Sequence, residues 1–143
     1  MEEYESKTYL SFVFILVFMI VSSIAIPIFL VGMVSPNIFI KIAYLDVSLL
    51  LWYMSWIIYR KERIYWINNF TYKQAAEMDP EERMRISKLF FDTFGRGCLL
   101  VALGMSVAII INTAFWIDLI VLTIGLFAGG ISFSLKLNKK VAE

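Results

Sequence analysis

The sequence predicts an all-α polytopic membrane protein with four transmembrane helices and an additional amphipathic interfacial helix in a cytoplasmic loop. Of the 143 residues, 60% are hydrophobic and the mean hydropathy is +0.76, whereas soluble domains are about 45–50% apolar. Charged residues are also segregated: none lies between Lys7 and Lys41, but residues 60–96 are dense in charge. Such alternation is typical of a chain that passes repeatedly between membrane and water.

The first half of the chain contains two apolar segments of the roughly 20 residues that cross a bilayer. The first covers residues 9–31, and Gly32 followed by Ser35-Pro36-Asn37 predicts a tight turn after it. The second covers residues 38–59 and stops at a basic stretch that begins with Arg60. These segments are the first two predicted spans.

The second half contains an apolar run of 38 residues, 98–135, interrupted only by Asp118. At about 1.5 Å per residue a single helix of this length would be nearly twice as long as a bilayer core of about 30 Å. The run must therefore form a hairpin. Asn112, Thr113 and the interfacial aromatic Trp116 mark its turn, so spans are predicted at 95–112 and 114–135, and residues 1–143 form one domain.

The central loop, residues 60–94, contains a helix of its own. Asp79 can cap a helix that starts at Pro80, and Glu81 and Glu82 complement the helix dipole. Apolar and basic residues then alternate, as in a helix that lies on a membrane and turns into the third span near residues 95–97. Packing on the cytoplasmic ends of the bundle is an equally acceptable position.

Aromatic residues gather where the second span meets the loop. They predict an interfacial belt and a helix that continues to about Phe70. Basic clusters beside a span, here Arg60, Lys61 and Arg63, also attract anionic lipid headgroups. The belt consists of Trp56, Tyr59, Tyr65 and Trp66.

The distribution of basic residues predicts the orientation. With four spans, the two tails and the central loop fall on one side and hold 12 of the 13 lysines and arginines. Only Lys41 lies on the other side. The positive-inside rule then predicts a multi-pass protein of the cell membrane with both termini in the cytoplasm.

Three charged residues near the extracytoplasmic end are the candidate ligand or ion site: Lys41, Asp46 and Asp118. An ionisable group at membrane depth is costly and indicates function by default. The three side chains could form a polar cluster at the mouth of the bundle, with Lys41 neutralising one carboxylate. The simpler alternative is that both carboxylates lie at headgroup level and bracket helix ends.

Small residues predict helix-packing faces. Gly104 and Ala108 lie four residues apart in the third span, and Gly125 and Gly129 form a GxxxG pattern in the fourth. The pattern identifies an interface and leaves open whether the partner helix belongs to the same chain. In the second span, Lys41, Ser48 and Ser55 recur every seven residues and are expected to face neighbouring helices, with interhelical hydrogen bonds from the hydroxyls.

The sequence offers little for catalysis. It has no histidine and a single cysteine, Cys98, and it contains no phosphate-binding loop, nucleophile elbow or HExxH motif. We therefore expect no catalytic residue, no metal site and no cofactor. The expected partners are the lipid bilayer and either a second copy or another membrane protein, and no nucleic acid is expected.

The tract from Asn69 through Met78 to Gly95 resembles that of small prokaryotic membrane proteins distantly similar to SdpI-type bacteriocin immunity proteins, which place a short polar helix between spans. This resemblance implies a noncatalytic membrane role and transfers no functional residue. Four spans of this size also resemble small multidrug resistance transporters, but those carry a glutamate in the first span and residues 9–31 contain no acid.

Two functions are therefore expected. The preferred one is a noncatalytic membrane protein that acts by association, as an accessory, regulatory or immunity-type factor. The alternative is a small oligomeric transporter or channel that uses the intramembrane carboxylates of Asp46 and Asp118.

Overall fold

The computed structural model describes residues 9–67 and 70–141, and these residues are helical with no strand. Four helices within them are long and apolar enough to cross a membrane, which confirms the predicted all-α polytopic fold. The elements in order are α1 (Leu10–Leu30), α2 (Pro36–Lys61), the 3₁₀ turn η1 (Ile64–Trp66), α3 (Tyr72–Glu77), α4 (Pro80–Phe90), the π-helical turn η2 (Phe91–Gly95), α5 (Arg96–Ile111) and α6 (Phe115–Val141).

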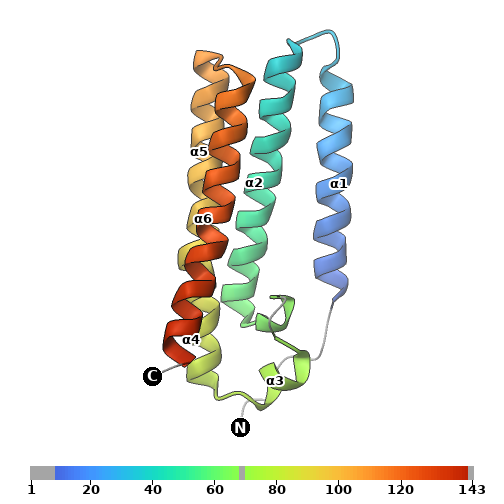
Figure 1. The fold of residues 1–143 in the computed structure, drawn as a ribbon. Helices are drawn as coiled ribbons and strands as arrows, with labels where there is room; N and C mark the ends of the chain where they lie inside the picture. The colour runs from blue at the N-terminus through green and yellow to red at the C-terminus, as the bar shows by residue number, and fades with distance from the viewer. Residues whose placement is uncertain (1–8, 68–69, 142–143) are drawn as a thin grey trace.

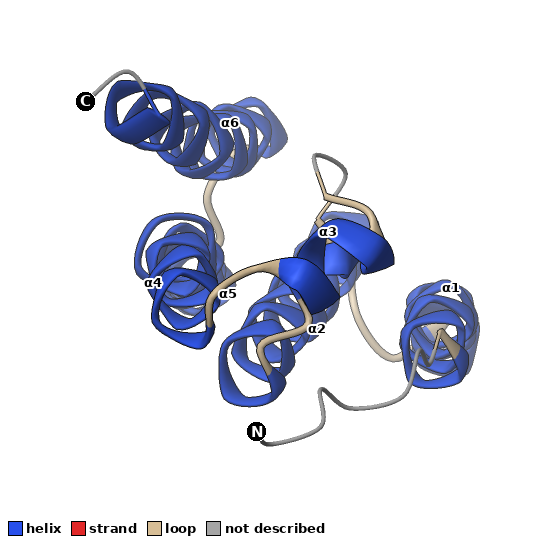
Figure 2. Cartoon of the chain, turned by 90° about the horizontal axis from the view of Figure 1, so that it is seen from below, coloured by secondary structure: helices blue, strands red, loops and turns tan. Residues whose placement is uncertain are grey.

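The long helices lie side by side (Figure 1), and their contacts place α2 and α5 between α1 and α6. Helix α1 packs on the outer side of α2, and α6 packs on α5. Seen along the bundle, α1 stands apart at one edge (Figure 2). One end of the bundle, here called the basic end, carries α3, α4, the start of α1 and the end of α6. The other, the hairpin end, carries the turns at 31–35 and 112–114.

Local sequence explains where α2 begins and ends. The Ser35 hydroxyl accepts a hydrogen bond from the Ile38 amide, and Pro36 occupies the first helical position, where a missing N–H costs nothing. At the other end Glu62 adopts a left-handed conformation with φ of 52°. The chain turns back there, so the predicted continuation of this helix to Phe70 is wrong.

The third span differs from its prediction because no turn separates it from the amphipathic helix. Helix α4 starts at Pro80 with the Asp79 cap, as predicted, but it runs through η2 directly into α5. The glycines expected to break the helix serve close packing instead. A Cβ at Gly95 would lie 2.5 Å from the Ser55 hydroxyl, and one at Gly97 would lie 3.1 Å from the Gly125 carbonyl oxygen.

Helix α6 also extends beyond its predicted end at residue 135, to Val141. The prediction followed the apolar boundary, but a helix satisfies its own backbone hydrogen bonds and can continue into water. Its 27 residues correspond to about 40 Å, longer than a bilayer core of about 30 Å. The surplus lies at the basic end.

The segment between α2 and α4 forms a small folded cap on the basic end. The side chains of η1 are buried together with Ala75 of α3 and Ile86 of α4. Tyr65 and Trp66 belong to this core, since they are only 5% and 8% exposed. They are therefore not part of an interfacial belt, whereas Trp56 of α2 is exposed.

Candidate functional site

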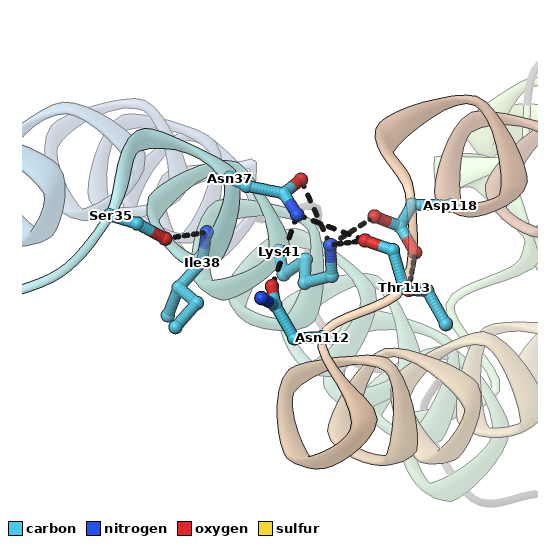
Figure 3. A network of polar contacts seen from close by, with 7 residues as sticks. All are labelled: Ser35, Asn37, Ile38, Lys41, Asn112, Thr113 and Asp118. Atoms are coloured by element: carbon cyan, nitrogen blue, oxygen red, sulfur yellow. Dashed lines mark hydrogen bonds and ion pairs between the residues drawn. The ribbon is translucent and has the colours of Figure 1, made fainter.

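Lys41 is the centre of a polar network at the hairpin end (Figure 3). It lies in the second turn of α2, and its side chain is completely buried. Its Nζ lies 3.0 Å from Oδ1 of Asn37, 2.7 Å from the carbonyl oxygen of Thr113 and 2.6 Å from Oδ2 of Asp118. The first two contacts are hydrogen bonds that the ammonium group donates, and the third is an ion pair.

Asp118, the ion-pair partner of Lys41, lies in the first turn of α6. A carboxylate there also interacts favourably with the helix dipole. Its side chain is 1% exposed, and its Oδ1 accepts a hydrogen bond from the Thr113 hydroxyl. Its Oδ2 accepts no hydrogen bond from the described residues and has the Lys41 ammonium as its ion-pair partner. The positive charge and the negative charge compensate each other within the protein.

The turn between α5 and α6 takes part in the same network. Asn112 ends α5 in a left-handed conformation with φ of 51°, which asparagine tolerates better than most residues. The amide of Asn37 donates to Oδ1 of Asn112 at 3.1 Å and to the carbonyl of Thr113 at 2.9 Å. The Thr113 carbonyl thus accepts from both Asn37 and Lys41, and the network attaches the α5–α6 turn to α2.

This network has the properties of a structural clamp. Its charges are paired, and its members come from α2, from α6 and from the turn between α5 and α6. Among residues 9–67 and 70–141, no group of three or more His, Cys, Asp or Glu side chains could hold a metal ion. The geometry therefore favours joining helices over binding a ligand.

Asp46 lies outside the clamp, contrary to the prediction of one cluster. Five residues separate it from Lys41, and at about 100° per residue the two side chains leave α2 about 140° apart. Asp46 faces α1, where its Oδ2 accepts a hydrogen bond of 2.6 Å from the Ser22 hydroxyl. Because α2 starts at Pro36, Asp46 lies about 15 Å along the helix, near the middle of a bilayer core of about 30 Å.

The predicted packing glycines lie against neighbouring helices of the same chain. A Cβ at Gly125 would meet the Val101 side chain at 2.2 Å, one at Gly129 the Phe94 Cα at 3.2 Å, and one at Gly104 the Val121 side chain at 3.3 Å. Ala108 is buried on α5. The three glycines therefore pack within this chain: Gly104 and Gly125 lie in the α5–α6 interface, and Gly129 lies against η2 and the start of α5.

The polar stripe of α2 is buried, as expected, but it makes different hydrogen bonds. Ser48 and Ser55 are completely buried. Their hydroxyls donate to carbonyls of α2 itself, Tyr44 and Trp52, each at 2.7 Å. These small side chains let neighbouring helices approach α2 closely, as Gly95 approaches Ser55. Neither hydroxyl donates a hydrogen bond to another helix.

A second ion pair, half-buried, which the sequence did not indicate, holds the cap at the basic end. Arg83 of α4 donates from Nε to Oε2 of Glu62 at 2.7 Å, and its Nη1 lies 3.2 Å from the Ala75 carbonyl and 3.3 Å from that of Met78. The available signal was weak: Arg83 lies three residues before Ile86, on the buried face of α4.

Comparisons of this chain with protein-family models, with curated proteins and with solved structures find no match. Arguments about function therefore depend on the geometry of the described residues. That geometry joins Lys41 to Asp118, places Asp46 between α1 and α2, and uses the glycines within the bundle.

Proposed function

We propose that this chain is a noncatalytic integral membrane protein that acts by association with another membrane protein, as an accessory, regulatory or immunity-type factor. The position of α1 carries the proposal. Helix α1 packs on α2 at one edge of the bundle and leaves its outward side open (Figure 2). One stripe of that side consists of exposed β-branched residues at helical spacing: Val13, Val17, Ile20 and Ile24.

The other predicted candidates for a binding surface, the glycine face and the charged cluster, already make contacts within this chain. This favours α1 as the helix that a partner binds. Gly125 and Gly129 face α5, so they are not open to a second copy of the chain. Lys41 and Asp118 satisfy each other. A partner helix can reach α1 without disturbing either arrangement. Association in membranes depends on van der Waals packing, and this stripe offers an apolar surface for it.

We further propose that the protein lies in the cell membrane with both termini in the cytoplasm. One end of the bundle carries the central segment with its basic residues, together with the start of α1 and the end of α6 (Figure 1). Lys41 is at the hairpin end and is neutralised by Asp118. The positive-inside rule assigns the basic end to the cytoplasm.

Site-specific photo-cross-linking in the native membrane tests the association. A photoreactive residue at Val17 or Ile24 of α1 is expected to give a discrete adduct with another protein. The matched control is the same residue at Ile124 of α6, which is similarly apolar and exposed, and it should give none. Equal adducts from both helices, or no adduct from α1, would contradict the proposal.

One observation favours a second function, that of a small transporter or channel. Asp46 places a carboxylate near the middle of the membrane, and ionisable groups at that depth line ion or proton pathways in many transporters. Under this alternative, purified protein in liposomes conducts ions or protons without a partner. Asp46→Asn abolishes the flux, and Asp118→Asn, made in the clamp, reports whether the flux also needs the second carboxylate.

Flux measurements on the purified protein in liposomes distinguish the two proposed functions. Flux from the purified wild-type protein alone would remove the association proposal. No flux from the wild type, or a flux that a correctly folded Asp46→Asn variant leaves unchanged, would remove the transport alternative.

A further inference from the structure

A groove follows the contact between α1 and α2 towards the basic end. The part of the groove farther from the basic end has a volume of about 560 Å³. Its walls are apolar side chains such as Leu10, Phe14 and Phe18 of α1 and Leu50 of α2. Cavities that hold small ligands have volumes of roughly 300–1,000 Å³. The groove is open to the side, where the acyl chains of a bilayer would surround the bundle.

The groove becomes cationic where it reaches the basic end. A second cavity of about 450 Å³ adjoins the first, with which it shares Ser11, Tyr53 and Ile57, and it is bounded by Arg60, Lys61 and Arg63. Arg60 and Lys61 are exposed, and among the described residues neither forms an ion pair. The nearest acid in the sequence, Glu62, is bound by Arg83. Two exposed cations, Arg60 and Lys61, without an ion-pair partner among the described residues therefore lie at the mouth of the groove.

Aromatic side chains line the boundary between the two parts. Tyr53 and Trp56 stack with their ring centroids 5.9 Å apart, and both are exposed. The Arg60 guanidinium carbon lies 5.9 Å from the centroid of the Trp56 ring. Aromatic rings with a polar edge favour the depth at which acyl chains give way to headgroups, so they place this boundary at the membrane interface.

The length of the groove corresponds to one leaflet. Ten residues separate Leu50 from Arg60, which is about 15 Å along a helix. Half of a bilayer core of about 30 Å is also about 15 Å. From the level of Trp56, where an acyl chain would start, the groove follows six residues of α2 to Leu50, about 9 Å, so it holds the part of the chain nearest the headgroup.

We infer that the α1–α2 groove binds one anionic phospholipid of the leaflet at the basic end, with its phosphate on Arg60 and Lys61 and one acyl chain between the helices. Charge complementarity selects an anionic headgroup over a zwitterionic one. The apolar length selects a membrane lipid over a soluble phosphate. The site is separate from the outward stripe of α1, so it does not depend on the protein partner proposed above.

Native mass spectrometry of the purified full chain tests this inference, with phosphatidylglycerol and phosphatidylethanolamine as the probes. The wild type is expected to retain one phosphatidylglycerol in preference to phosphatidylethanolamine. Arg60→Gln/Lys61→Gln should bind phosphatidylglycerol about 25-fold more weakly, since each basic group near the membrane surface contributes about a factor of five.

Two further variants keep the test decisive. Lys73→Gln/Lys88→Gln removes the same charge from exposed lysines of α3 and α4 that do not line the groove, and it should retain the lipid. Ser11→Trp fills the junction of the two cavities while Arg60 and Lys61 remain, and it should lose the lipid. Circular dichroism and thermal unfolding verify that each variant folds.

The inference is overturned if the wild type retains both lipids equally, or if the Arg60/Lys61 variant binds phosphatidylglycerol as the wild type does. Should that double variant fail to fold, Ser11→Trp decides: retention of the lipid with the groove filled excludes the site. A loss of lipid with unchanged cross-linking from α1 would show that the lipid and protein sites are independent.

Discussion

The Nζ of Lys41 lies 2.6 Å from Oδ2 of Asp118, and neither side chain reaches the surface of the protein. The pair joins α2 to α6, two helices that otherwise have little direct contact. A buried ion pair must compensate a large desolvation cost, and it does so only when hydrogen bonds satisfy the remaining donors and acceptors. Here Asn37 and Thr113 supply those bonds. The pair therefore specifies which helices meet and in which register.

Lys41→Met should destabilise the protein by about 3–5 kcal/mol, because it leaves the Asp118 carboxylate buried without its cation. Lys41→Met/Asp118→Leu, which removes both charges, should recover most of the loss. Thermal unfolding in detergent measures both effects. Lys73→Met, at an exposed lysine, serves as the control. Wild-type stability of the single variant would show that the pair is not a clamp.

Gly125→Ala should destabilise the α5–α6 interface by about 1–3 kcal/mol, the usual cost of overpacking. The added Cβ would lie 2.2 Å from the Val101 side chain. Gly130→Ala in the same helix is the matched control, since its Cβ would meet nothing within 4 Å. Val101→Ala should relieve the Gly125→Ala defect. Equal unfolding midpoints for the two alanine variants would contradict the close contact.

Arg83→Gln should loosen the cap at the basic end. It removes the cation from Glu62 and the donor from two carbonyls, at an expected cost of about 2–3 kcal/mol because Glu62 retains partial access to water. Hydrogen exchange is expected to quicken in η1 and α3 before it changes in α2. Arg85→Gln, at an exposed arginine, should leave exchange unchanged. Uniform exchange in both variants would argue against a separate cap.

Cysteine labelling tests the orientation. Met33→Cys, at an exposed position of the α1–α2 turn, should react with a membrane-impermeant maleimide on intact cells. Lys73→Cys should react with the same reagent only after the cell membrane is permeabilised. The native Cys98 is completely buried and should stay silent in both cases. The reverse pattern of labelling would place the basic end outside the cell.

Hydropathy, segment length and charge distribution were enough to predict the all-α class and the number of spans. The Asp79-Pro80 helix start is confirmed because capping is a local interaction between residues close in sequence. The boundaries were less predictable. Hydropathy marks where apolar residues end, whereas α6 and α4–α5 continue past those points because helical hydrogen bonds do not require a membrane.

Two glycine signals show what a pattern leaves open. GxxxG at Gly125 predicts a tight interface, and only the fold assigns α5 as its partner. The turn predicted near residues 95–97 is absent, and Gly95 lies inside a continuous helix, because in sequence a glycine at a turn and one that admits a neighbouring helix look the same. The neighbour, Ser55, is 40 positions away in the chain.

The sequence by itself determined that this protein is an all-α membrane protein with four spans, and it identified Lys41, Asp46 and Asp118 as charges that need partners. Tertiary structure alone decided the partners: Lys41 with Asp118, Asp46 with Ser22, and Arg83 with Glu62. The physical reason is that each pair joins different helices. Local propensity and hydropathy act within a segment, whereas the rotation of one helix against another depends on packing across the whole bundle.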